Sequence, residues 1–504
     1  MYYYFFINKY IKLFIFIIKN GAKCPVLSTN SGAKCPVLFD LINIICYNIF
    51  EKGANFMKRI IEKELNDWLK YDKKALLVEG ARQVGKTYSI RQILNDNSIN
   101  YFEINFIDRP DILKVIKNID NIDELIEKIE LYSTTPLIKG ESIIFLDEIQ
   151  LFPDIITKIK FLVDDARYRY ILSGSLLGVE ISGIKSIPVG YMRMIRMYPM
   201  NYFEFLTALG VKDETITYLE NCFNSRTKID ELIHNKMLRL FNTYLIVGGM
   251  PQVVQRFIDT KNLYEIDMEQ KNIVNNYKAD FSRYESNDRK LRIISIYENI
   301  PSQLNKQNLR FIFTYLNKEL KFDRYENSFL WLKDAGVAYP VYIAKEVKSP
   351  LVISKDKNTF KLFLSDVGLL TSCYPFVVRE DIMNDTNNFN NGALFENFVA
   401  QELYANNITP YYYKSTKIGE IDFMVEYGNK IIPIEIKSGS DYKTHKSISN
   451  LINNYKDNII NPIVFSKSNL FVEDGIIYAP IYLVGFLKEK INKDKKILVD
   501  IENL

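Results

Sequence analysis

Two glycines, a lysine and a threonine stand at the spacing GxxxxGK[ST] in residues 80–87, between an apolar run and a helical pattern. The apolar run, residues 76–78, is typical of a buried strand, and residues 88–94 continue as a helix. Backbone N–H groups of such a loop wrap phosphate oxygens, its glycines permit close approach, and the helix N-terminus adds positive potential. A glycine turn without a ligand is the weaker alternative. We therefore predict an α/β fold with a parallel sheet and a nucleotide site. The predicted phosphate contacts are Gly80, Ala81, Arg82, Gln83, Val84, Gly85, Lys86 and Thr87.

Residues 143–146 form a second apolar run, and two acids follow it, Asp147 and Glu148. Ligands gather at the carboxyl ends of parallel strands, so we expect Asp147 beside a Mg²⁺ ion that Thr87 also ligates. Lys86 would reach the β and γ oxygens of ATP, and Glu148 would polarise the attacking water. Two acids are also common in the first turn of a helix, which is the less favoured interpretation.

A third strand is expected over residues 168–172, followed by Ser173, whose hydroxyl could sense the γ-phosphate. Arg193 and Arg196 stand in an alternating run over residues 191–198. Either arginine could reach a phosphate, and a solvated strand face explains both equally well. We therefore assign no arginine finger.

The first 56 residues differ in character from the rest of the chain. Their apolar start is interrupted by polar residues and lacks the run of about 20 apolar residues that spans a membrane. The segment GAKCPVL occurs twice, at residues 21–27 and 32–38, and a proline in each copy argues against a coiled coil. We expect residues 1–56 to be translated upstream sequence, with Met57 as the true start. A membrane anchor is the alternative.

Composition argues against several kinds of site once this extension is set apart. The extension holds the whole net charge of +4 and three of the five cysteines, which leaves a neutral remainder with only Cys222 and Cys373. So few cysteines make a poor disulfide framework, and two distant histidines, His234 and His445, leave little for a histidine-built metal site. Catalysis should therefore rest on carboxylates, lysines, arginines and backbone amides, in a cytoplasmic protein.

Residues 201–375 are predicted to be mainly helical. The expected elements near the end of this segment are three helices and two strands, at residues 293–300, 309–316, 325–335, 339–344 and 360–365. Three helices followed by a hairpin suggest a winged helix, in which one helix could enter the major groove of DNA. DNA readers usually show a basic face, so coupling to a partner protein is the favoured alternative in this neutral chain.

A β-hairpin is predicted over residues 418–437, because two strand-like runs flank the turn pair Gly428-Asn429. If the residues next to the turn pair, Asp422 lies opposite Glu435. Strict alternation then separates a polar face from an apolar face. The polar face holds Glu420, Asp422, Glu435 and Lys437, and the apolar face holds Ile421, Phe423, Ile434 and Ile436.

The polar face of this hairpin is a candidate metal site. Two facing carboxylates repel unless a cation lies between them, and a divalent metal ion is the natural one. We expect Asp422 and Glu435 to bind it, together with Glu396 from the margin of an apolar helix stripe. Lys437 would stabilise the charge of an attacked phosphate. A solvated face with ordinary Glu–Lys pairs is the alternative, and a one-residue slip of register would move the whole set.

The chain from residue 57 onward resembles AAA+-type P-loop ATPases of bacteria and archaea that are joined to a C-terminal domain of unknown function with a restriction-endonuclease-like end. The motifs that carry the resemblance are LLVEGARQVGKT (76–87), IIFLDEIQ (143–150), ILSGSLLG (171–178), YPMNYFEFL (198–206), GGMPQVV (248–254), FKLFLSDVGLL (360–370), GALFENFVAQEL (392–403), GEIDF (419–423) and IEIKSG (434–439). The chain departs from the family at residues 188–199, where an acidic or arginine-bearing turn is usual.

The resemblance implies three domains after the extension at residues 1–56. They are an ATPase domain over 57–200, a helical and winged-helix segment over 201–375, and a small α/β domain like the PD-(D/E)xK nucleases over 376–504. In that nuclease-like fold Glu396, Asp422 and Glu435 would hold the metal ion, with Lys437 beside it.

Two functions remain open at this stage. In one, ATP and Mg²⁺ at the first site gate a C-terminal nuclease that acts on DNA. In the other, the last domain is a non-cleaving binding module and the ATPase is a conformational switch in signalling or defence. A partner protein and a homo-oligomer are compatible with both, and no membrane partner is expected.

Overall fold

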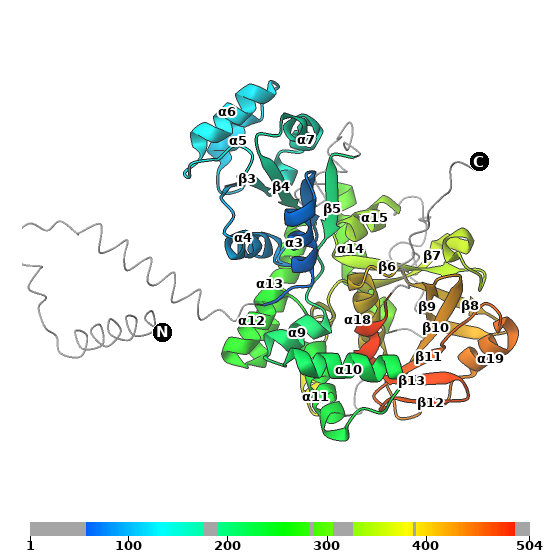
Figure 1. Cartoon of the computed structure of the whole chain (residues 1–504). Helices are drawn as coiled ribbons and strands as arrows, with labels where there is room; N and C mark the ends of the chain where they lie inside the picture. The colour runs from blue at the N-terminus through cyan, green and yellow to red at the C-terminus, as the bar shows by residue number, and fades with distance from the viewer. Residues whose placement is uncertain (1–56, 176–189, 282–286, 306–325, 387–389, 489–504) are drawn as a thin grey trace, which may run out of the picture. The chain divides into compact units, whose positions relative to one another are not determined.

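The computed structural model describes residues 57–175, 190–281, 287–305, 326–386 and 390–488 (Figure 1). Our expectations for residues 1–56 lie outside this range. The chain from Met57 onward forms one compact unit. No helix within the described ranges is both long enough and apolar enough to cross a membrane.

The first part of the unit is a five-stranded sheet in the order β2-β3-β4-β1-β5, and every pairing is parallel. Its elements in chain order are α3 (Ile61–Tyr71), β1 (Ala75–Glu79), α4 (Lys86–Asp96), β2 (Tyr101–Asn105), α5 (Pro110–Ile116), α6 (Ile122–Tyr132), β3 (Ile143–Asp147), the 3₁₀ helix η2 (Ile149–Leu151), α7 (Asp154–Asp165), β4 (Arg169–Gly174) and β5 (Met192–Arg196). Helices α3 and α4 pack on one face of the sheet, and α5, α6 and α7 pack on the other. Strands β1 and β3 are buried at every position because both faces are covered. The predicted parallel sheet is confirmed.

A helical part follows the sheet. It comprises α9 (Tyr202–Ala208), α10 (Asp213–Ser225), α11 (Glu231–Val247), α12 (Pro251–Thr260), α13 (Leu263–Phe281), α14 (Asn287–Leu304) and α15 (Glu326–Asp334). Helix α9 begins with a capping box, in which the side chains of Asn201 and Glu204 each accept the other's backbone N–H at 2.8 Å. The helix expected at residues 309–316 lies outside the described residues, so the winged helix stays a prediction.

The last part is an eight-stranded sheet in the order β12-β13-β11-β10-β9-β8-β6-β7. Its elements are β6 (Ala338–Ala344), η5 (Leu351–Ser354), β7 (Lys355–Leu364), α16 (Val367–Thr371), α17 (Val377–Met383), α18 (Gly392–Ala405), β8 (Tyr411–Ser415), β9 (Gly419–Tyr427), β10 (Lys430–Ile436), α19 (Lys446–Tyr455), β11 (Ile463–Ser466), β12 (Phe471–Glu473), β13 (Ile476–Pro480) and η6 (Ile481–Phe486). Helix α18 packs on one face of this sheet and α19 on the other.

The strand pair that we expected as the wing of the 201–375 segment is present as β6 and β7. Strand β6 also pairs in parallel with β8, at Tyr342 with Tyr411 and Ile343 with Tyr412. The hairpin therefore forms one edge of the C-terminal sheet. The sequence could not show this, because the pairing joins strands almost 70 residues apart.

The register of the β9–β10 hairpin is confirmed, and the strict alternation of its faces is wrong. Tyr427 pairs with Lys430, and the same register continues to Phe423 and Ile434. The pairing of β8 with β9, however, shifts by one residue just beyond Phe423. This bulge moves Ile421 into the core under α19, whereas Phe423 packs in the core under α18.

A tight junction joins the helical part to the C-terminal sheet. The buried carboxylate of Asp366, which follows β7, accepts the backbone N–H groups of Gly249 at 2.5 Å and Leu369 at 2.9 Å. Gly249 in turn accepts the N–H of Met200 at 2.7 Å. A Cβ atom on Gly249 would lie 1.9 Å from the carbonyl oxygen of Met200, so only glycine fits there.

The side of α18 that faces this junction carries three buried polar residues. Asn397 exchanges hydrogen bonds with the backbone of Leu364 at 2.8 and 3.0 Å, and Gln401 accepts the N–H of Val367 at 2.9 Å. Glu402 accepts the N–H of Tyr202 at the start of α9, also at 2.9 Å. Helix α18 therefore bonds both to the end of β7 and to the helix that follows the ATPase sheet.

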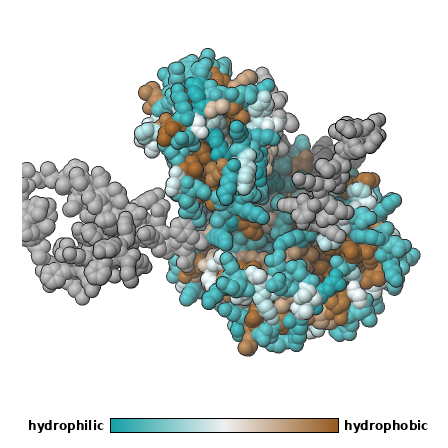
Figure 2. Space-filling view, viewed as in Figure 1, coloured by the Kyte–Doolittle hydropathy of each residue, from teal (hydrophilic) through white to brown (hydrophobic). Residues whose placement is uncertain are grey.

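Apolar residues on the face shown in Figure 2 are scattered among hydrophilic ones. Exposed apolar side chains include Leu131 on α6, Leu232 on α11 and Met268 on α13, which belong to separate elements. Scattered apolar residues of this kind are normal on soluble proteins, so they mark no docking surface.

We predict that Gly249→Ala destabilises the chain by about 1–3 kcal/mol or more, because the added methyl group meets backbone that cannot move aside. Gly439→Ala is the matched control, since a Cβ atom there meets nothing within 4 Å. Urea unfolding of both variants measures the difference. Equal midpoints for the two variants would contradict the close approach at Gly249.

Candidate functional site

The loop between β1 and α4 has the backbone geometry that its two glycines require. Gly80 has φ of 150°, and a Cβ atom there would lie 2.3 Å from the carbonyl oxygen of Met197. Gly85, directly before α4, is left-handed with φ of 97°. Residues other than glycine rarely adopt such angles. The two glycines therefore allow the tight loop that a phosphate-binding site requires.

Lys86 is the first residue of α4, and its side chain is buried within the loop. Its ammonium group donates to the carbonyl oxygens of Gly80 at 2.9 Å and Ala81 at 2.8 Å. Burial lowers the pKa of Lys86 to about 8, against the opposing effect of Glu148 and Asp147. A phosphate group in the loop would supply the counter-charge that this buried ammonium lacks in direct contact.

Asp147, at the end of β3, is 1% exposed and is the centre of a hydrogen-bond cluster. Its carboxylate accepts from the Thr87 hydroxyl at 2.9 Å, from the Asn105 amide at 2.9 Å and from the Ser173 hydroxyl. The predicted proximity of Thr87, Asp147 and Ser173 is therefore present in the structure. Their hydroxyl and carboxylate oxygens are the ligand types that Mg²⁺ prefers, so these residues fit the ion.

Asn105 is a member of this cluster that the sequence analysis missed. It is the last residue of β2, which pairs in parallel with β3 so that Asn105 lies beside Asp147. The signal that could have identified it was a polar residue at the end of an alternating strand, at the same sheet edge as Asp147.

Glu148 follows β3 in a left-handed conformation with φ of 59°. A residue with a side chain seldom adopts this angle, and such strain gathers at functional sites. The carboxylate accepts a hydrogen bond from the Gln150 amide, a contact that the sequence analysis did not predict. Glu148 is thus held beside the loop, next to the cluster around Asp147.

The loop is held from outside by three groups. Arg59, which precedes α3, donates to the carbonyl oxygens of Val84 at 2.8 Å and Tyr198 at 2.7 Å. From α13, the Tyr277 hydroxyl donates to the Arg82 carbonyl at 2.9 Å, and Asp280 pairs with the Arg82 side chain at 2.5 Å. Elements outside the ATPase sheet therefore determine where the loop lies.

The two arginines of β5 form ion pairs within the ATPase domain, and neither is identified as an arginine finger. Arg196 pairs with Glu79 at 2.7 Å, and Arg193 lies 3.8 Å from Glu64. Both pairs join neighbouring elements of the ATPase domain, which agrees with leaving the finger unassigned.

The second candidate site, on the C-terminal sheet, contains a lysine that we did not predict. Lys361 of β7 is fully buried, and its ammonium lies 3.1 Å from Glu396 and 2.9 Å from Glu420. Nearby, Lys437 pairs with Glu435 at 2.9 Å, and Asp422 accepts the N–H of Ile436 at 2.7 Å. The sequence showed Lys361 only as one residue of an apolar strand.

Burial governs the ionisation of this acidic cluster. It raises the pKa of Glu396 to about 8 and that of Glu435 to about 7, and it also raises the pKa of Asp422. Burial acts to lower the pKa of Lys361, but the carboxylates of Glu396, Asp422 and Glu420 raise it above its ordinary value overall. In the described ranges, no group of three or more histidine, cysteine, aspartate or glutamate residues is placed to hold a metal ion. The predicted ligands Glu396, Asp422 and Glu435 are close enough to affect one another electrostatically, and Lys361 lies among them.

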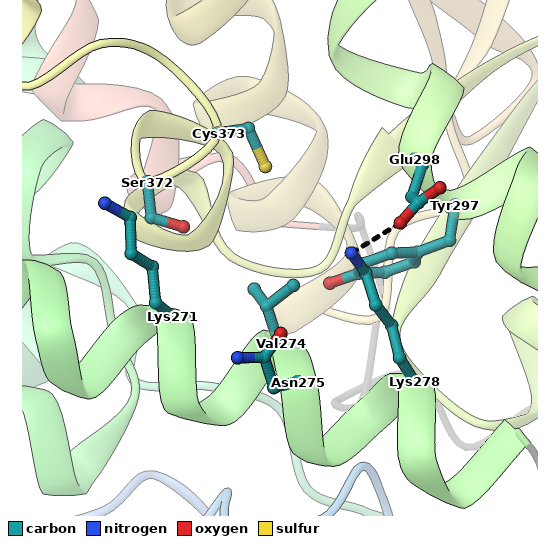
Figure 3. A pocket seen from close by; sticks show the side chains of 8 residues that line it. All are labelled: Lys271, Val274, Asn275, Lys278, Tyr297, Glu298, Ser372 and Cys373. Carbon is teal, nitrogen blue, oxygen red and sulfur yellow. Dashed lines mark hydrogen bonds and ion pairs between the residues drawn. The ribbon is translucent and has the colours of Figure 1, made fainter.

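Helices α13 and α14 border a pocket of about 380 Å³ that no sequence motif indicated (Figure 3). Its lining residues are Lys271, Val274, Asn275, Lys278, Tyr297, Glu298, Ser372 and Cys373. Lys278 pairs with Glu298 at 2.6 Å, and Lys271 pairs with Asp267 at 2.7 Å. Because both lysines already have carboxylate partners, we assign no ligand to this pocket.

Three family models match parts of the chain. Residues 72–206 match an AAA domain, residues 238–377 match a domain of unknown function (DUF8612), and residues 391–484 match another domain of unknown function (DUF4143). A comparison with curated proteins gives no match.

Solved structures of low sequence identity are also similar to this chain. A Walker-type ATPase of Pyrococcus abyssi is 16% identical, with 63% of this chain and 96% of that chain covered and a TM-score of 0.41. The Orc1 protein of Aeropyrum pernix, solved in complex with DNA, is 14% identical over 64% and 92% of the two chains, with a TM-score of 0.23. The RuvB Holliday junction branch migration motor of Thermotoga maritima is 11% identical over 55% and 88%, with a TM-score of 0.26.

The AAA match covers the parallel sheet, the glycine loop and the acidic strand that carries Asp147 and Glu148. The loop geometry and the cluster around Asp147 are those that a nucleotide site of this kind needs. Residues 72–206 of this chain are therefore an AAA-type ATPase domain.

Proposed function

We propose that the protein binds and hydrolyses ATP and that its nucleotide state acts on the C-terminal domain. The observation that carries the proposal is the contact between Thr87 and Asp147 beside the buried Lys86. These residues come from the loop and from the adjacent strand, and together they suit a nucleotide with its Mg²⁺ ion.

Each residue has a role that follows from its position. Lys86 would donate to the β and γ oxygens in place of the two loop carbonyls that it now contacts. Thr87 and Asp147 would hold Mg²⁺, which neutralises charge on the phosphates when it is bound. Glu148 would orient the attacking water and accept its proton, and Ser173 would donate toward the γ-phosphate.

We predict that Glu148→Gln lowers ATP turnover by about 10²-fold or more while ATP binding remains, because the amide cannot accept the proton of the attacking water. Glu141→Gln is the control, since Glu141 is exposed and precedes β3. Phosphate release and equilibrium binding of ATP are measured on the same samples. Undiminished turnover in Glu148→Gln would show that hydrolysis does not use this residue.

A chain of buried contacts links the glycine loop to α18. Arg59 contacts the loop at Val84 and pairs with Glu204 of α9 at 3.0 Å. At the start of α9 the N–H of Tyr202 donates to Glu402 of α18. Because every member of this chain is buried, a shift of the loop cannot be absorbed by solvent and has to displace its neighbours.

The prediction that tests this link concerns Glu402. Glu402→Ala removes the acceptor of Tyr202, so the C-terminal domain should lose its response to nucleotide. Glu402→Gln keeps an oxygen that can accept this N–H and should retain the response. Deuterium uptake of residues 392–405 and 419–437 is compared between ADP and a non-hydrolysable ATP analogue. Glu380→Ala, at an exposed site on α17, controls for nonspecific effects. An identical uptake in both nucleotide states of the unmodified protein would refute the coupling.

A metal-dependent nuclease acting on DNA is a second candidate function for the C-terminal domain. The observation that favours it is the contact in which Asp422 accepts the N–H of Ile436, the residue between Glu435 and Lys437. The alternative is a binding module without cleavage, used by the ATPase as a conformational switch. A partner protein and a homo-oligomer are predictions that fit either function.

Under the nuclease hypothesis, the full chain cleaves DNA with Mg²⁺ or Mn²⁺, and Asp422→Ala and Lys437→Ala abolish the cleavage. A DNA assay with and without ATP measures this. Lys443→Ala is the control, because Lys443 lies in a turn before α19 and forms an exposed ion pair with Glu473 of β12. No cleavage by the unmodified protein, or equal cleavage by all variants, would leave the binding module as the function of this domain.

A further inference from the structure

Lys361 is an unusual residue to find at the centre of a folded domain. Its side chain is fully buried, although lysine is almost never buried without partners. Pairing of Val341 with Lys361 in the β6–β7 hairpin sets the position of its backbone. A lysine held there needs local negative charge, because removing an ammonium group from water is strongly unfavourable.

Carboxylates from two elements supply that charge. Glu396 on α18 and Glu420 on β9 both contact the ammonium group, and the ring of Tyr412 on β8 lies 5.2 Å from it. Asp422 acts on Lys361 electrostatically from the same strand as Glu420. The ammonium group thus lies among Glu396 and Asp422, two of the acids that were predicted to bind a metal ion, and Glu420.

We propose that Lys361 is the resident cation of this acidic cluster, and that a divalent metal ion binds there only when the Lys361 ammonium is displaced. A metal ion bound by Glu396 would have to lie within about 2–2.6 Å of its oxygens. The ammonium already lies 3.1 Å from the same carboxylate. Two cations so close together in a buried site repel strongly, so only one of them can occupy it.

The charges of the cluster support this exchange. The carboxylates are Glu396, Glu420, Asp422 and Glu435, and the lysines are Lys361, Lys414 and Lys437. With all four carboxylates ionised and all three lysines in place, the formal charge is −1. Without Lys361 it becomes −2, which matches one divalent ion. Lys414 and Lys437 are partly exposed, so water already screens them and they exclude a metal ion less effectively.

The proposal concerns the cluster that the nuclease hypothesis uses, but it does not depend on ATP turnover or on cleavage. Binding of Mn²⁺ to the nucleotide-free full chain, measured by electron paramagnetic resonance, tests it directly. Loss of a bound ion in Asp422→Asn assigns that ion to this cluster. The unmodified protein should show no ion that Asp422→Asn removes.

Lys361→Met should create one Mn²⁺ site with an affinity roughly tenfold or more above that of the unmodified protein. Lys414→Met makes the same charge change at the rim of the cluster and should create none. Adding Asp422→Asn to Lys361→Met should remove the new site. Because Lys361→Met leaves buried acids unpaired, the double variant Lys361→Met/Glu420→Gln serves if the single variant does not fold.

Two results would overturn the proposal. One is Mn²⁺ bound to the unmodified protein and lost in Asp422→Asn. The other is a folded Lys361→Met or Lys361→Met/Glu420→Gln variant that gains no Mn²⁺ site. A DNA cleavage result of either sign leaves this measurement unaffected, so the failure of the nuclease hypothesis and the failure of this proposal are distinguishable.

Discussion

The buried guanidinium group of Arg59 fixes the glycine loop relative to everything that follows it. One side chain donates to Val84 in the loop, to Tyr198 after β5 and to Glu204 in α9. Removing one partner of a buried ion pair typically costs about 3–5 kcal/mol, because the other charge is left without compensation. The same arginine therefore sets the position of the phosphate cradle and the start of α9. It adds to the contacts that Tyr277 and Asp280 of α13 make with Arg82 in the loop.

The polar contacts that connect Arg59 to the C-terminal domain lie in the interior of the protein and not on its surface. Glu204 belongs to the capping box of α9, and Glu402 of α18 accepts the first N–H group of the same helix. Burial raises the pKa of Glu402 to about 8. The carboxylate of Asp366 plays the corresponding part at Gly249. Buried polar groups of this kind specify one arrangement, since any other would leave them without hydrogen bonds.

Local patterns were sufficient to predict the loop, the acidic strand and the hairpin register. Gly80 and Gly85 are needed because of their backbone angles, and Asp147 because it ends a buried strand. Both features can be recognised from a few neighbouring residues in the sequence. Lys361, Arg59 and Asn105 were not predicted, because each acquires its role from a partner far away in the chain. The bulge near Asp422 was missed for a related reason. It arises from pairing with β8, and a hairpin considered alone contains no sign of it.

Helix α18 carries Glu396 near one end and Glu402 near the other, six residues apart. At about 1.5 Å per residue, their Cα atoms lie roughly 9 Å apart along the helix axis, and the backbone hydrogen bonds of the helix resist stretching. A helix of this kind transmits a displacement along its axis without changing its size. A movement of α9 by a fraction of an ångström would therefore move Glu396, and with it the Lys361 ion pair, by a similar distance. Ion pairs in a dry interior change steeply in energy over such distances. Under the proposed coupling, the nucleotide site would act on the C-terminal cluster through the distance between Lys361 and Glu396.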